Sequence, residues 1–412
     1  MSIFATTNVF KTPQRNRANW LRAPQRVFLR RAIFQLHLWV GVLVAVYAVI
    51  IGLTGSALIF KDEIQHTLQP NIYHVAPVAQ KTTLDAAVRK IESSHPDWKA
   101  FALRNFDGTQ AVDVLMRPAT GESTPNYRVV SINPYTGEVL LDRLRYAGFL
   151  GFMSNLHVYL LSGETGLLVS GWLAFGLLLL SLSGLILWWP GVQRWAAALV
   201  LTSRSSWRRL NWDLHTVIGF WSSALFLIVI VTGLDFAFPG ATGKMIELST
   251  GRGFHDTGVS LEANSRKAVA GSAPVITIDK ALAAARQALP QQAPPGYLQL
   301  PSTPALPYRA TGYYNGAAPY SQVVRILLDS HSGALLASSD TRNQDRGSRI
   351  EQYFVALHFG LFGGPGMLGL IVKIIWVLLG LVPALLAGTG LLMYWNRKLR
   401  PIWRSMTAAR SE

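Results

Sequence analysis

Four apolar runs, each long enough to cross a lipid bilayer, constrain the fold of this chain more than any other feature. A bilayer core of about 30 Å takes about 20 apolar residues in a helix. Long polar segments separate the first run from the second and the third from the fourth. The sequence therefore predicts a membrane α-helical protein with two soluble inserts. The four runs cover roughly residues 34–60, 167–189, 213–238 and 368–395.

Basic residues are distributed unevenly between the polar segments. Residues 1–33 carry seven Lys and Arg and no acid, and the connector 190–212 carries four and no acid. The tail 396–412 has five basic residues and one acid, whereas the first insert balances ten basic with ten acidic residues. By the positive-inside rule, both termini and the connector are expected in the cytoplasm and the inserts on the far side. This pattern explains the net charge of +16, so nucleic-acid binding is the weaker interpretation.

Several classes of site are excluded by composition. The chain has no cysteine, which excludes disulfides, iron–sulfur clusters, thiolate-ligated zinc or haem, and cysteine catalysis. No Gly-rich nucleotide fingerprint or Walker A motif follows a predicted strand. The first apolar run is too long for a signal peptide and lacks a convincing cleavage site, so we interpret it as an uncleaved anchor.

The two halves of the chain repeat each other within the membrane. LHLWVG at 36–41 matches LHTVIG at 214–219, and LTGSALIF at 53–60 matches VTGLDFAF at 231–238 without a gap. The second and fourth spans correspond more loosely and share LHVYLLSGETG with LHFGLFGGPG, and SGLILWW with TGLLMYW. All four spans contain Ser-Gly or Thr-Gly near one end. Because the two copies run in the same direction, any symmetry axis should stand along the membrane normal.

The inserts repeat as well. Each opens with apolar residues at helical spacing, over 84–94 and 278–289. Each closes with a predicted hairpin whose turn holds glycine, over 129–142 and 325–338. We therefore predict a four-helix transmembrane bundle from a duplicated unit, with two α+β soluble domains.

Four of the nine histidines lie at span ends or entrances and form two equivalent pairs. His37 and His215 begin the first and third spans, while His157 and His358 precede the second and fourth, just before Gly-rich breaks. Two imidazoles facing each other across a helical bundle are what a low-spin b-type haem needs as axial ligands. The pattern predicts two bis-histidine haem sites, one held by His37 and His215 and the other by His157 and His358.

Glycines accompany these histidines. Gly41 and Gly219 lie four residues after His37 and His215, which we interpret as room for a porphyrin edge. Gly55 and Gly233 follow at 18 residues, five helical turns along the same face, and are interpreted as space for the second haem. Close packing of helices is an alternative role for these glycines.

Other interpretations of the histidines stay open. A single histidine at a membrane end is often only an interfacial hydrogen-bonding residue. A zinc or copper site would need more ligands at one depth than two histidines supply. Ionisable residues at or near membrane depth are weaker candidates for haem propionate, proton or anion binding. These are Asp235, Lys373, Lys61, Arg145 and Arg349.

These motifs resemble those of the PepSY-associated transmembrane proteins, or iron-regulated membrane proteins, which include di-haem ferrisiderophore reductases of Gram-negative inner membranes. The resemblance rests on the LHxxxG starts, the two LHxxL segments, SGLILWWP at 183–190 and the hairpins SINPYTGEVL and LLDSHSGALL. It implies two b haems, PepSY-like domains in the periplasm, and reduction of periplasmic ferric chelates by electrons from inside.

The resemblance implies an oxidoreductase of iron acquisition. Electrons from a cytoplasmic or quinol donor would pass the two haems to a ferric siderophore or similar chelate and release Fe(II), with no acid–base or nucleophilic residue. One alternative is a cytochrome b electron-transfer subunit for a separate periplasmic enzyme or quinone. Another is a PepSY-type sensor or inhibitor in which the histidines are structural.

The expected organisation follows from these assignments, with the protein spanning the bacterial inner membrane and surrounded by its lipid. The segments are a basic cytoplasmic N-terminus (1–33), transmembrane helix 1 (34–60), periplasmic PepSY-like domain 1 (61–147), an outer interfacial helix and Gly-rich turn (148–166), transmembrane helix 2 (167–189), a basic cytoplasmic loop (190–212), transmembrane helix 3 (213–238), periplasmic PepSY-like domain 2 (239–350), a second interfacial helix and turn (351–367), transmembrane helix 4 (368–395) and a cytoplasmic tail (396–412).

Overall fold

The structure is a computed structural model that describes residues 28–122, 124–201, 206–250, 274–318, 321–344 and 346–408. Most of the basic N-terminal segment, Arg204 of the connector, His255 and Arg410 lie outside the described residues. The chain divides into two compact units. Unit 1 comprises the described residues of Met1–Leu43, Leu179–Ser223 and Thr389–Glu412, and unit 2 those of Val44–Leu178 and Ala224–Gly388.

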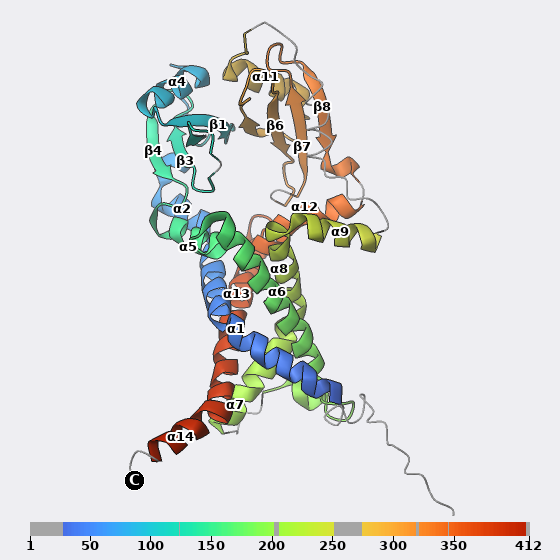
Figure 1. The fold of residues 1–412 in the computed structure, drawn as a ribbon. Coiled ribbons are helices and arrows are strands. Elements are labelled where there is room, and N and C mark those ends of the chain that lie inside the picture. The colour runs from blue at the N-terminus through green and yellow to red at the C-terminus, as the bar shows by residue number, and fades with distance from the viewer. Residues whose placement is uncertain are drawn as a thin grey trace, which may run out of the picture. The chain divides into compact units, whose positions relative to one another are not determined.

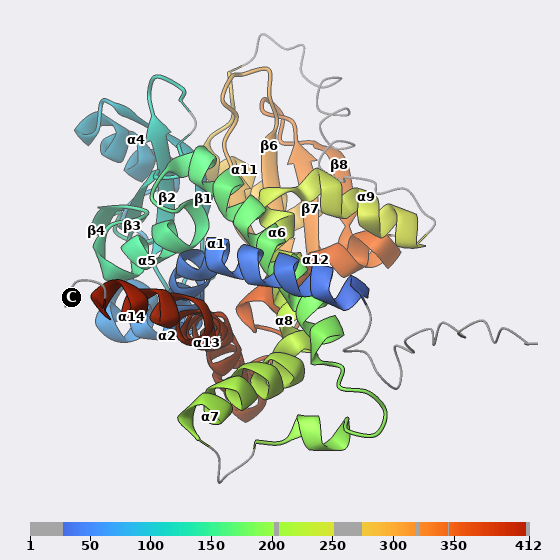
Figure 2. The ribbon, with the colours of Figure 1, turned by 60° about the horizontal axis from the view of Figure 1, so that its bottom comes forward.

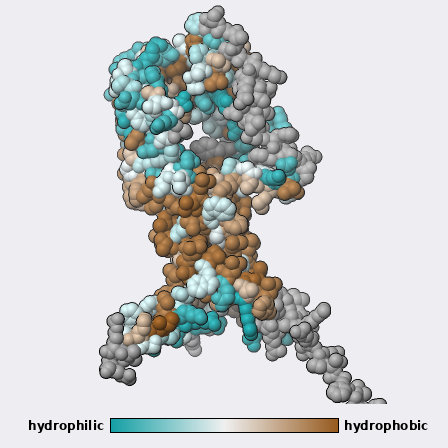
Figure 3. Space-filling view, viewed as in Figure 1, coloured by the Kyte–Doolittle hydropathy of each residue, from teal (hydrophilic) through white to brown (hydrophobic). Residues whose placement is uncertain are grey.

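Four helices in the described part of the chain are long and apolar enough to cross a membrane (Figure 1). Apolar residues cover their surfaces (Figure 3), as lipid contact requires. The protein is therefore a multi-pass membrane protein. The spans are Phe28–Leu58 (α1), Gly163–Trp188 (α6), Trp207–Ala237 and Met367–Thr407.

The third and fourth spans are not regular α-helices throughout. The third consists of α7 (Trp207–Asp213), a π-helical turn η3 (Leu214–Ile218) and α8 (Gly219–Ala237), which follow one another in Figure 2. The fourth consists of α13 (Met367–Tyr394), a π-helical turn η5 (Trp395–Leu399) and α14 (Arg400–Ala408). A π-helical turn changes the direction of the side chains that follow it.

Unit 1 is held together by aromatic stacking and by polar groups that satisfy helix ends. The rings of Trp188 and Phe220 stack with centroids 3.8 Å apart. Arg30 donates to the carbonyls of Leu187 and Trp189 at the end of α6, where carbonyls lack helical partners. The hydrogen bonds of Arg30 satisfy backbone carbonyls that the end of the helix would otherwise leave without a partner.

In unit 2, small residues let α1 and α13 approach closely. A Cβ added to Gly52 would lie 2.7 Å from the carbonyl oxygen of Gly380, and Ser56 Oγ donates to the Val377 carbonyl at 2.9 Å. Such close approach is the usual basis of helix association in membranes. Short helices connect the spans to the inserts: α2 (Lys61–Leu68), α3 (Pro70–Tyr73), α5 (Gly148–Tyr159), α9 (Pro239–Thr250) and α12 (Arg346–Phe359).

The two inserts build one eight-stranded antiparallel sheet in the order β4-β3-β2-β1-β5-β6-β7-β8 (Figure 1). Each insert contributes four strands, and its last two form the hairpin that the sequence predicts. β1 and β5 join the two sets, a pairing that leaves neither strand as an exposed edge. The strands are β1 (Trp98–Arg104), β2 (Val112–Pro118), β3 (Arg128–Ile132), β4 (Val139–Leu144), β5 (Pro295–Gln299), β6 (Tyr308–Tyr313), β7 (Val323–Leu328) and β8 (Leu335–Asp340).

Helices α4 (Leu84–Ser94) and α11 (Ile278–Ala288) pack against one face of this sheet and share one core with it. Both are amphipathic and bury residues at helical spacing, as their sequences predict. The sequence predicted two soluble domains, whereas the core is continuous across β1 and β5, where Leu103 lies opposite Leu298 and both are fully buried. Local patterns cannot specify such a pairing between segments nearly 200 residues apart.

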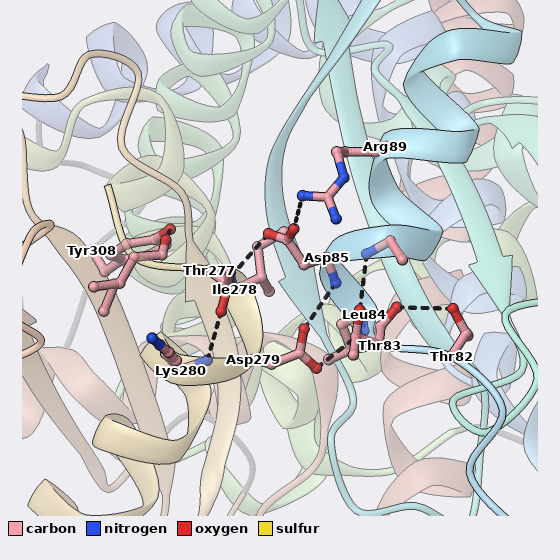
Figure 4. Close-up of polar contacts among 12 residues, drawn as sticks. Thr82, Thr83, Leu84, Asp85, Arg89, Thr277, Ile278, Asp279, Lys280 and Tyr308 are labelled. Atoms are coloured by element: carbon pink, nitrogen blue, oxygen red, sulfur yellow. Dashed lines mark hydrogen bonds and ion pairs between the residues drawn. The ribbon is translucent and has the colours of Figure 1, made fainter. Parts of the chain in front are cut away.

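The first turns of α4 and α11 cap each other (Figure 4). The Asp279 carboxylate accepts hydrogen bonds from the backbone N–H groups of Leu84 and Asp85, each at 3.0 Å. In return, the Asp85 carboxylate accepts from the backbone N–H of Ile278 at 3.2 Å. Helix N-termini favour negative charge, so each insert supplies the carboxylate that caps the N-terminus of the helix in the other insert.

Candidate bis-histidine sites

His37 and His215 lie next to each other within unit 1. His37 comes from α1 and His215 from the π-helical turn η3. Their ring centroids are 6.3 Å apart and the ring planes are nearly perpendicular, at 86°. Two segments 178 residues apart in the sequence thus place their imidazoles together, as the alignment of the two halves predicts.

His157 and His358 form a second pair within unit 2. They lie near the ends of α5 and α12, outside the four spans. Their ring centroids are also 6.3 Å apart, with an angle of 61° between the planes. The two pairs therefore have the same ring separation, although one is built on span residues and the other on connecting helices.

A hydroxyl group holds each of the four imidazoles through its Nδ1 atom. In every case the hydroxyl belongs to a different membrane-spanning helix from the residue it supports, so that each site draws on four segments. The Nδ1–oxygen distances are 2.9 Å for His37 and Ser183, 2.9 Å for His215 and Thr389, 3.0 Å for His157 and Thr54, and 3.1 Å for His358 and Thr232.

The direction of these hydrogen bonds fixes the tautomer. The Thr54 hydroxyl donates its single proton to the carbonyl of Ile50 at 2.6 Å, so its oxygen accepts from the His157 ring. The same arrangement occurs at Ser183 and Thr232, which donate to carbonyls four residues earlier. Nδ1 therefore carries the proton and Nε2 keeps its lone pair. A hydrogen bond from the nitrogen that does not bind the metal is the usual way to orient a metal-binding histidine.

The carbonyl of Val229 gives independent support for this tautomer at His358. It lies 3.2 Å from Nδ1, and a carbonyl oxygen can only accept. The ring of His358 is thus held by a hydroxyl and a carbonyl together.

A glycine follows each of these hydroxyl residues, and the imidazole occupies the space above it. A Cβ added to Gly55 would lie 2.9 Å from Cε1 of His157, and one added to Gly233 would lie 3.1 Å from Cε1 of His358. Both distances are shorter than ordinary carbon contacts. At Gly184 and Gly390 the corresponding distance, to the first pair of histidines, is 3.4 Å.

These contacts revise the role that the sequence suggested for Gly55 and Gly233. We expected the space at these positions to admit a haem, and the structure places the histidine rings there instead. A Cβ at Gly41 would meet Leu180 at an ordinary 3.7 Å. The repeated Ser-Gly and Thr-Gly pairs are visible in the sequence, but nothing in the spacing connects their hydroxyl groups to the histidines.

Burial keeps the second pair of imidazoles neutral. It lowers the pKa of His157 to about 3, with a further contribution from nearby His358, whose own pKa burial lowers to about 4. Neutral imidazole is the form that binds a metal. Both rings are therefore competent ligands at physiological pH.

The spacing of the rings fits two ligands on opposite sides of one metal. A metal–nitrogen bond of about 2.0 Å and a five-membered ring radius of about 1.1 Å place the two centroids about 6 Å apart. Among the described residues, no cluster of three or more His, Cys, Asp and Glu side chains could hold a metal ion. The donor set therefore suits a group that brings its own equatorial ligands, as haem does.

Three of the weaker candidates from the sequence make contacts with residues other than the four histidines. Lys373 forms an ion pair with Glu63 of α2, and Asp235 accepts a hydrogen bond from Thr242. Arg145 lies over the rings of Tyr127 and Tyr146, each at 5.0 Å. None of these contacts involves either histidine pair.

Together, the spans and the paired rings define a class of protein: a multi-pass membrane protein with two pairs of neighbouring histidines, each oriented by a hydroxyl group. The chain belongs to the family of PepSY-associated transmembrane proteins, because the family model described as the PepSY-associated TM region matches residues 34–397. A comparison with curated proteins finds no match.

Proposed function

We propose that this protein is a di-haem b reductase of the bacterial inner membrane that reduces a ferric siderophore or similar ferric chelate and releases the iron as Fe(II). The observation that carries the proposal is the pair of bis-histidine sites. Each combines two paired imidazoles with a hydroxyl group at Nδ1, and a contact at Nδ1 directs iron binding to Nε2.

His37 and His215 would hold one haem, and His157 and His358 the other. A bound haem supplies one-electron transfer, for which the protein provides position and surroundings. Ser183, Thr389, Thr54 and Thr232 would set the orientation of the four imidazole rings. Because Fe(II) binds the hard oxygens of a siderophore weakly, reduction releases the metal.

The orientation in the membrane is part of the proposal. The excess of Lys and Arg in the N-terminal segment, the connector and the tail supports a cytoplasmic location for all three. The first histidine pair would then lie toward the cytoplasm and the sheet in the periplasm. Electrons would enter from a cytoplasmic or quinol donor.

Gene duplication is the proposed origin of this arrangement. Each insert supplies one amphipathic helix followed by four strands, and the joint sheet reads outward from β1 and β5 in the same order. The hydroxyl-histidine contacts also correspond: Thr54 serves His157 as Thr232 serves His358. Equivalent contacts in both halves support a duplicated unit.

Anaerobic stopped-flow spectroscopy tests the function. Detergent-purified protein, reduced with dithionite and freed of excess reductant, is mixed with a ferric chelate while the visible spectrum is followed. We expect the b-type α-band to decay and Fe(II) to appear in a ferrozine assay, one Fe(II) per electron. A band that stays reduced would favour an electron-transfer subunit instead. A preparation without a haem spectrum would contradict both functions and favour a sensor or inhibitor.

A further inference from the structure

A cavity of about 880 Å³ lies in unit 2, where the two inserts join. β1 and β5 pair there, with Arg104 directly opposite Tyr297, and both residues line the cavity. Since Leu103 and Leu298 point into the core beneath α4 and α11, their neighbours Arg104 and Tyr297 lie on the other face of the sheet. The volume is within the range of small-molecule sites, about 300–1,000 Å³.

Aromatic rings from both inserts line this cavity. Phe101 and Tyr127 come from the first insert and pack together with ring centroids 5.7 Å apart. Tyr297 and Tyr313 come from the second, and the ring of Tyr313 covers Gly296. Flat apolar walls of this kind favour a ligand with aromatic rings.

Two of the tyrosine hydroxyls in the cavity are unpaired. Within the part of the chain that the structure describes, neither Tyr127 nor Tyr297 uses its hydroxyl in a hydrogen bond. Burial, and then the proximity of Tyr127, raises the pKa of Tyr297, which keeps its proton in place. Neither hydroxyl donates to another described residue, so both can donate to an oxygen-rich ligand.

The charge around the cavity is positive. Arg286 lines it and donates to the backbone carbonyl of Phe106, and Arg145 lies behind it over the ring of Tyr127. In the described ranges, neither guanidinium forms an ion pair with a carboxylate. The acid on the cavity wall, Asp107, is turned to its own loop, where it accepts hydrogen bonds from Thr109 and Gln110.

A further basic residue, Lys61, lies between the end of the first span and the arginines near the cavity. Lys61 begins α2, just after α1 ends. Burial lowers the pKa of Lys61, and the nearby charges of Arg145, Arg143 and Arg104 lower it further, whereas Asp62 opposes them. Arg104 itself is paired with Asp113. Cations without carboxylate partners around a concave site attract and concentrate anions.

We propose that this cavity binds an anionic ferric chelate whose donor groups are aromatic, the catecholate class, in preference to a cationic hydroxamate chelate. This inference rests on the proposed function and adds its substrate class. The rings of Phe101, Tyr127 and Tyr297 contact the catechol rings. The hydroxyls of Tyr127 and Tyr297 donate to the catecholate oxygens, and Arg286 contributes the charge-assisted contact.

Binding of redox-inert gallium chelates to the detergent-purified full-length protein tests the proposal. Isothermal titration calorimetry compares a trianionic Ga(III) tris-catecholate with a cationic Ga(III) trihydroxamate. We expect the catecholate to bind at least about tenfold more tightly, a difference of about 1.4 kcal/mol. Equal affinities, or a preference for the hydroxamate, would overturn the proposal.

Variants then locate the site. Arg286→Glu should weaken catecholate binding about 10- to 100-fold, as expected for loss of a charge-assisted contact. Lys280→Glu makes the same charge change on the same helix, outside the cavity, and should leave affinity within about twofold. Tyr127→Phe and Tyr297→Phe remove only a hydroxyl each and should weaken binding severalfold. An Arg286→Glu protein that binds like wild type would place the ligand elsewhere.

The two proposals fail separately in this design. Gallium is not reduced, so these affinities do not depend on electron transfer. Selective catecholate binding by a protein that lacks haem would support the cavity and contradict the reductase. Haem-dependent reduction of ferric chelates without selective binding would overturn the cavity's ligand class alone.

Discussion

At the residue scale, each site depends on a histidine, a hydroxyl and a glycine that come together from distant segments. The two pairings could be predicted because His37 aligns with His215 and His157 with His358. The hydroxyls could not, since a contact such as Thr54 with His157 depends on how the connecting helix α5 returns over α1. Helical spacing within one span carries no such information.

Removing one hydroxyl tests this support. Thr232→Val keeps the size of the side chain but removes the hydroxyl acceptor of His358 Nδ1 and leaves only the Val229 carbonyl. Loss of a hydrogen-bond partner of a metal-binding histidine typically costs 10- to 100-fold in metal affinity, and because one acceptor remains we expect a loss of about tenfold for one of the two haems. Haem titration of the apoprotein, followed in the Soret band, measures it. Thr232→Ser retains the acceptor and should bind within a fewfold of wild type.

Adding one methyl group tests the glycines. Gly55→Ala places a Cβ 2.9 Å from His157 Cε1, so the ring must move, and one haem should be lost or weakened. Gly240→Ala adds the same group to α9, where it would meet nothing within 4 Å, and should keep both. Pyridine haemochrome analysis gives the haem content of each variant. Full content in Gly55→Ala would contradict the close contact.

At the element scale, the helices of the inserts could be predicted better than the sheet. The sequence indicated helices over 84–94 and 278–289, and the structure has Leu84–Ser94 and Ile278–Ala288. Amphipathic spacing and a capping threonine before each helix encode these elements locally. The joining of β1 to β5 depends instead on two edge strands from different inserts, which no local pattern specifies.

The mutual capping of α4 and α11 predicts that damage to one insert weakens the other. Asp279→Ala removes the acceptor for the N–H groups of Leu84 and Asp85, in a helix nearly 200 residues away. Loss of such a cap costs about 1–2 kcal/mol, so these amides should exchange about 5- to 30-fold faster.

Hydrogen exchange with mass spectrometry measures this effect on the full-length protein in detergent. Glu138→Ala, which removes a carboxylate from the turn between β3 and β4, serves as the control and should leave exchange in α4 unchanged. Unchanged exchange in Asp279→Ala would show that the inserts are stabilised independently.

At the scale of the whole molecule, four apolar runs predict four spans, and the structure contains four such helices among its described residues. The π-helical turn that carries His215 was not foreseen, because it leaves no periodic signal distinct from an α-helix. The sequence could indicate that two imidazoles meet, while the distance and angle between the rings of His37 and His215 are properties of the folded chain.

Haem content and electron paramagnetic resonance of the four single His→Ala variants test the central claim most directly. Purified wild-type protein should contain two low-spin b haems with bis-histidine signals. His37→Ala and His215→Ala should each lose the same signal, while His157→Ala and His358→Ala should each lose the other. Wild-type protein without haem, or variants that pair His37 with His157, would contradict the account.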